Sequence, residues 1–105
     1  MALSNAVQNA RHTPQVITWQ DNDGEPLNLY GGSLSGRVRD LATLTARNID
    51  GTLTIIDGPA GVFQWAYGTL DVGTAGAFEV QFIATFGGGL ADRTLNEPWR
   101  VVEAI

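Results

Sequence analysis

Apolar and polar residues alternate along much of this chain, the pattern of β-strands that bury one face and expose the other. The pattern is longest over residues 76–86, where Phe78, Val80 and Phe82 share one face and Glu79 lies on the opposite face. Shorter runs of the same kind cover residues 15–20, 33–39, 52–56, 62–67 and 99–102. The chain is therefore predicted to consist mainly of short strands.

Residues that favour tight turns separate these runs. Glycine, proline, aspartate and asparagine gather at residues 21–26, 48–51, 57–61 and 87–89. Several short strands with a turn signal about every 8–12 residues are typical of an all-β sandwich or barrel. We predict an immunoglobulin-like β-sandwich of about seven antiparallel strands. Residues 63–67 and 78–86 should face each other across its core, with Trp19 and Trp99 filling the ends.

Two segments leave alternatives open. Residues 2–13 could form a short helix capped by Ser4, or an arm or edge strand. Residues 40–47 are predicted to be a strand end followed by a loop, although apolar residues there also have helical spacing. We divide the chain into an N-terminal arm or edge strand, residues 1–14, and a sandwich domain, residues 15–105.

The composition limits the function more than the fold. The 105 residues include no cysteine, and six basic residues, all arginines, stand against eleven acidic ones for a formal net charge of −5. A phosphate-binding surface needs clustered positive charge, so we expect no nucleic-acid partner and no docking to an anionic membrane. Without cysteine or lysine, thiolate and Schiff-base chemistry are excluded, and we expect no cofactor.

The hydropathy of the chain bears on its localisation. Residues 1–15 lack the basic start and the apolar run of a Sec signal peptide. No stretch approaches the ~20 apolar residues of a transmembrane helix. We therefore expect synthesis in a cytoplasm and no insertion into a membrane.

Candidate catalytic groups are few. His12 lies in the least regular segment, with no acid or nucleophile near it in the sequence, so a solvated loop histidine is the better interpretation. Glu79 lies on the strand face opposite the aromatic row and is expected to be solvated. Many carboxylates fall in turns, where they accept hydrogen bonds from backbone amides: Asp21, Asp23, Asp50, Asp57 and Asp71. We predict a protein with no catalytic or cofactor-binding residues, and not an enzyme.

The acidic turn at residues 21–25 matches a calcium-binding EF-hand loop poorly. Placing Gly24 at the invariant glycine of that loop puts Trp19 where the first acidic ligand is needed. The same alignment puts Tyr30 where the bidentate glutamate is needed. A plain acidic turn is favoured, and we predict no metal site.

The aromatic residues allow two interpretations. They could form a sugar-stacking platform, as in carbohydrate-binding sandwiches, or they could fill the core. Most share periodic faces with aliphatic residues, which favours the core. Tyr30 precedes Gly31 and Gly32 in a loop and is the aromatic residue expected to be exposed.

The order of motifs over about residues 15–102 is similar to that of a known family. The order is a strand, DNDGEPLNL, a glycine pair, residues 33–39, DGTLTI, AGVFQWAY, TAGAFEVQFIATF, a glycine turn and a closing strand. This resembles the N-terminal Ig-like domain of phage baseplate upper proteins and related small phage tail modules, in which a D-x-D-G-x-P-x-x-L turn precedes the second strand. The resemblance implies a structural module that contacts copies of itself or neighbouring tail proteins, and no catalytic residues.

Two function hypotheses follow from these observations. The first is a non-enzymatic phage or prophage virion protein, assembled in the host cytoplasm, that self-associates and contacts other tail or baseplate proteins. The alternative is a carbohydrate-binding module for cell-surface attachment. For either function, the candidate partner or ligand contacts are Tyr30, Arg37, Arg39, Asp21 and Asp23.

Overall fold

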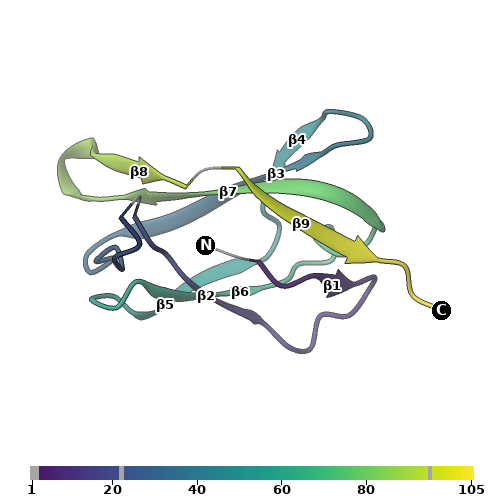
Figure 1. Ribbon diagram of the computed structural model, residues 1–105, viewed down its shortest axis with the longest axis horizontal. Coiled ribbons are helices and arrows are strands. Elements are labelled where there is room, and N and C mark those ends of the chain that lie inside the picture. Colours follow the sequence, from purple (N-terminus) through teal and green to yellow (C-terminus); the bar gives the residue numbers. More distant parts are fainter. Residues whose placement is uncertain (1–2, 22, 95) are drawn as a thin grey trace.

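The computed structural model describes residues 3–21, 23–94 and 96–105, which form a two-layered β-sandwich (Figure 1). The prediction of an all-β sandwich is confirmed. Four residues that fall within predicted segments lie outside the described residues: Met1, Ala2, Asn22 and Leu95. The strands are β1 (Ala6–Val7), β2 (Gln15–Thr18), β3 (Ser33–Asp40), β4 (Ala46–Asn48), β5 (Thr52–Asp57), β6 (Val62–Ala66), β7 (Gly76–Thr85), β8 (Ala91–Arg93) and β9 (Glu97–Val102). Within the described residues, one 3₁₀ turn, η1 (Gly87–Gly89), joins β7 to β8.

The two sheets differ in size. The larger has the order β1-β9-β7-β3-β4, with β8 also paired to β7, and the smaller has the order β2-β6-β5. β8 and β9 pair with successive parts of one edge of β7. Between them, the Thr94 hydroxyl accepts a hydrogen bond from the Phe82 N–H, and the Thr94 N–H donates to the Phe82 carbonyl. One buried threonine thus keeps the ladder continuous where the chain passes from β8 to β9.

The core is rich in aromatic side chains and lies between the strand faces that the alternation of apolar and polar residues predicted to be buried. Phe63 and Trp65 of β6 face Phe82 of β7, with Phe63 and Phe82 ring centroids 5.0 Å apart in an edge-to-face arrangement. Trp19 packs against Phe63 at one end of the core. Toward the other end, the ring centroids of Trp99 and Trp65 lie 4.7 Å apart. The predicted facing of these two strands, with tryptophans at the ends of the core, is confirmed.

The segment over residues 40–47 contains a strand that the sequence did not predict. After β3, the Leu44 N–H donates to the Asp40 carbonyl, and the Asp40 N–H donates to Thr45, closing a turn. Leu44 has a φ of 59°, which a helix does not tolerate. The chain then returns as β4 and pairs with β3. A hairpin, and not a helix or a plain loop, follows β3.

Within the described part of the N-terminal segment, two residues form an edge strand, β1. β1 pairs with β9 in parallel, so the sandwich is not wholly antiparallel, and nine strands are described where about seven were predicted. Ala6 is 6% exposed and belongs to the core cluster. Burying Ala6 and pairing the backbone with β9 stabilise the strand more than an isolated short helix could be stabilised.

Candidate interaction surfaces

The five candidate contact residues fall on two separate surfaces. Arg37 and Arg39 lie on β3, at positions that point away from the core of the larger sheet. Asp21, Asp23 and Tyr30 lie in the connection between β2 and β3, at one end of the sandwich. The structure therefore does not combine the five residues into one site.

The first surface is the outer face of the larger sheet. Directly paired residues on antiparallel strands point to the same side. Arg37 and Arg39 pair with Gln81 and Glu79 of β7, Arg93 of β8 pairs with Ile83, and Arg100 of β9 pairs with Ala77. We call the four outward arginines, Arg37, Arg39, Arg93 and Arg100, with Glu79 and Gln81 between them, the arginine face.

A shallow groove of about 410 Å³ crosses the arginine face. Its lining comes from β3, β4, β7, β8 and the segment after β8: Arg37, Arg39, Ala46, Glu79, Gln81, Ile83, Arg93 and Asn96. The guanidinium groups of three arginines thus stand around one depression, beside two amides and one carboxylate. A surface of this chemistry suits carboxylates, which arginine can hold with two parallel hydrogen bonds.

Charge on this face is only partly neutralised within the chain. The Arg39 guanidinium forms an ion pair with Glu79 at 2.8 Å, and the two side chains are 44% and 29% exposed. Glu79, expected to be solvated, is therefore paired. Arg37 donates to the Asn48 side-chain carbonyl at 2.8 Å. Among the described residues, no hydrogen bond or ion pair engages the guanidinium of Arg93 or Arg100.

The second surface is built from two neighbouring turns. The Trp19 N–H donates to the Gly61 carbonyl, and the Leu29 N–H donates to the Gly58 carbonyl. Gly61 has a φ of 70°, and a Cβ there would lie 2.8 Å from the Trp19 carbonyl oxygen, so a side chain would force the turns apart. These contacts hold residues 20–21 and 23–30 beside the turn between β5 and β6, at the left of Figure 1.

The side chains on these two turns are acidic and aromatic. We call the exposed residues Asp21, Asp23, Glu25, Asp57 and Tyr30 the acidic end. Asp21 accepts the backbone N–H groups of Asp23 and Glu25, so it shapes the turn. Tyr30 is 81% exposed, as the sequence predicted, and lies against Gly58. This end presents four carboxylates beside one aromatic ring.

One carboxylate is buried, a feature that the sequence did not reveal. The Asp71 side chain is 0% exposed and its two oxygens accept five hydrogen bonds. The donors, at 2.8–3.1 Å, are the backbone N–H groups of Asp50, Gly51 and Gly68, the guanidinium of Arg47 and the indole N–H of Trp65. Asp71 thus joins the end of β6 to the β4–β5 connection.

The electrostatics of Asp71 indicate a structural role. Burial raises the pKa of this carboxyl, but hydrogen bonds from the Asp50 and Gly68 N–H groups, from Arg47 and from Trp65 outweigh burial and hold the pKa below its ordinary value. An ionised carboxylate that already accepts five hydrogen bonds has no proton to donate and no access to solvent. In the sequence Asp71 looks like an ordinary turn aspartate, and no local pattern indicates that it is buried.

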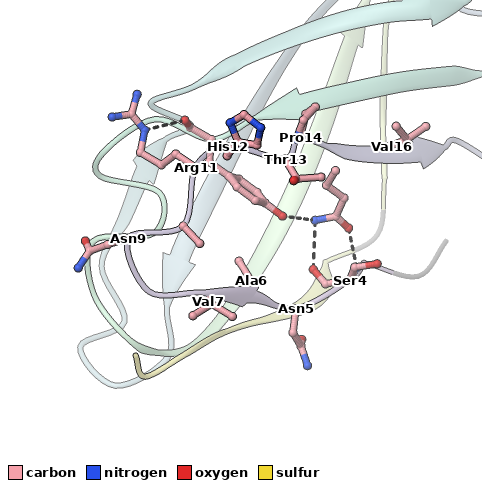
Figure 2. Close-up of a pocket in the computed structure, with 13 residues that line it drawn as sticks. Ser4, Asn5, Ala6, Val7, Asn9, Arg11, His12, Thr13, Pro14 and Val16 are labelled. Atoms are coloured by element: carbon pink, nitrogen blue, oxygen red, sulfur yellow. Dashed lines mark hydrogen bonds between the residues drawn. The ribbon is translucent and has the colours of Figure 1, made fainter. Parts of the chain in front are cut away.

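A hollow of about 740 Å³ lies along the N-terminal segment (Figure 2). Gln15, 6% exposed, donates to the Tyr67 hydroxyl and the Ser4 carbonyl and accepts the Ser4 N–H. Burial raises the pKa of Tyr67, against the lowering effect of the hydrogen bond from Gln15. His12 lies exposed at the rim, and no carboxylate is among the lining residues to form an acid–base pair with it.

The aromatic side chains do not form a sugar-stacking platform of tryptophans. Trp19, Trp65 and Trp99 are 3%, 0% and 2% exposed, and all three belong to the core. Among the phenylalanines, tyrosines and tryptophans that the structure describes, Tyr30 alone is exposed. The carbohydrate-binding alternative loses the paired tryptophans that it required.

Comparison with known proteins gives this chain no family. The sequence matches no protein-family model, and no curated protein is significantly similar to it. Within residues 3–21, 23–94 and 96–105, no three histidine or acidic side chains gather where a metal ion would be held. In the same ranges, no helix has the length and apolarity to cross a membrane. The two exposed surfaces remain the candidate sites.

Proposed function

We propose that this chain is a non-enzymatic structural module of a phage or prophage virion. It acts in a tail or baseplate through contacts with neighbouring proteins and with copies of itself, and it is assembled in the host cytoplasm. The virion setting is supported by the resemblance of residues 15–102 to the N-terminal Ig-like domain of baseplate upper proteins.

The interaction role is carried by one observation, the arginine face. Arginine is enriched and lysine is depleted at protein–protein interfaces, because the planar guanidinium pairs with carboxylates and stacks on aromatic rings. This chain has arginine alone as its basic residue, and four of its six arginines lie on one exposed strand surface. A surface that serves only solubility does not require arginine in place of lysine, or arginines gathered on one face.

The test is to find the chain in particles. Virions are purified by density gradient from the phage or lysogen that encodes the chain, and its copy number is measured by quantitative mass spectrometry. The chain should follow the tail proteins through the gradient in constant ratio. An abundant host cytoplasmic protein, measured in the same fractions, should be depleted. If the chain is found only in the soluble lysate, the proposed function is wrong.

A further inference from the structure

The charges of this protein are divided between its surfaces. The arginine face holds four arginines and one outward carboxylate, Glu79, since the other acidic strand residues pair with inward positions or close turns. The rest of the chain holds two arginines against ten carboxylates. Both of those arginines are engaged, Arg47 with Asp71 and Arg11 with the Tyr67 carbonyl. A net acidic protein therefore carries one distinctly basic surface.

The acidic end is the complement of that surface within the same chain. Its four carboxylates lie on turns that project at the end of the sandwich, and no arginine lies on them. Tyr30 adds an exposed ring, on which a guanidinium can stack. Carboxylates and an aromatic ring are the groups that an arginine-lined groove binds best.

We infer that the arginine face binds the acidic end of a second copy of this chain, an inference that rests on the proposed self-associating role. Asp23 and Glu25 of one copy reach Arg37 and Arg93 of the next, and Tyr30 lies against the guanidinium groups. The two surfaces occupy different sides of each copy, the outer face of the larger sheet and the end where β5 and β6 meet (Figure 1).

Because the two surfaces differ, the contact is heterologous. Each copy uses its acidic end toward one neighbour and its arginine face toward the other, which produces a closed ring or an open chain, not a two-fold dimer. Attraction between opposite charges also steers the encounter and weakens as salt rises. Association should therefore depend on both protein concentration and ionic strength.

Two variants separate the surfaces without touching the core. Arg37→Gln/Arg93→Gln removes the charge that the contact needs from the arginine face, and Asp23→Asn/Glu25→Gln removes it from the acidic end. Asp21 is left intact because its carboxylate shapes the turn. Glu103→Arg, at an exposed position after β9, controls for change of charge alone. Circular dichroism and thermal unfolding verify that each variant folds as the wild type does.

Sedimentation velocity then measures assembly at about 0.05 M and about 0.5 M salt. The wild type and Glu103→Arg should form species larger than a dimer at low salt and dissociate at high salt. Each double variant alone should be a monomer. Mixed in equal amounts, the two should form a one-to-one complex and nothing larger, because one working surface of each kind remains. Tyr30→Ala should weaken assembly.

The outcomes distinguish the inference from the proposed function. Association that is insensitive to salt and to both double variants overturns the inference and leaves a self-associating structural module in place. A wild type that stays monomeric at every concentration overturns the inference and removes self-association from the proposed function. A monomer whose arginine face instead binds heparin, used as an acidic polysaccharide probe, also overturns the inference.

Discussion

Replacing Asp71 by asparagine tests how much of the fold depends on one buried carboxylate. Asparagine has the same shape but puts an NH₂ group where one oxygen stood, so a donor faces donors. At the Oδ1 position the change loses the hydrogen bonds from the Asp50 N–H and from Arg47; at the Oδ2 position it loses three. The surviving bonds weaken because the acceptor is no longer charged.

The magnitude follows from the bonds lost. A hydrogen bond to a charged group contributes about 1.5–3 kcal/mol, and breaking a buried ion pair typically costs about 3–5 kcal/mol. Asp71→Asn should therefore lower the free energy of unfolding by about 3–5 kcal/mol, a large share of the roughly 5–15 kcal/mol of a typical domain. Arg47→Ala removes one partner, itself 34% exposed, and should cost less.

Urea unfolding followed by tryptophan fluorescence measures both variants, with Trp65 close to the change. The acid dependence provides a second measurement. The folded pKa of Asp71 is depressed below the unfolded value of 3.8. Its contribution is therefore complete above that pH and is lost as the pH falls through the folded pKa. Asp71→Asn should remove this part of the acid sensitivity. A loss under about 1 kcal/mol, or one smaller than that of Arg47→Ala, would refute the reasoning.

Three further predictions concern the arm, a turn and the core. Gln15→Ala should cost about 1–3 kcal/mol because it leaves the buried Tyr67 hydroxyl without the Gln15 hydrogen bond. It should also expose the bond after Arg11 to trypsin, while Gln8→Ala should do neither. Gly51→Ala should lower the free energy of unfolding by about 1–3 kcal/mol or more, because the added Cβ would lie 2.0 Å from the Ala66 carbonyl oxygen. The control Gly87→Ala adds a Cβ in open space and should change that free energy by less than about 0.5 kcal/mol. The three buried tryptophans should give blue-shifted emission with weak acrylamide quenching; strong quenching would contradict the core.

The candidate surfaces could be predicted only in part. Tyr30 follows a turn-rich stretch and precedes two glycines, so its exposure was readable from the sequence. Arg37 and Arg39 flank the buried Val38 on their strand, so the alternation of polar and apolar residues predicted their outward positions. The positions of Arg93 and Arg100 could not be predicted, because their place on the same sheet face as Arg37 and Arg39 depends on which strands pair with β7.

The sequence by itself determined the fold class, the main strands and the inward faces. Period-two alternation acts within a few residues, so Phe78, Val80 and Phe82 were bound to share the buried side wherever their strand lay. Only the tertiary structure decided the pairing of β1 with β9, the burial of Asp71 and the gathering of arginines on one face. These features join residues far apart in the chain, and their energies arise from contacts that exist only once both sheets have formed.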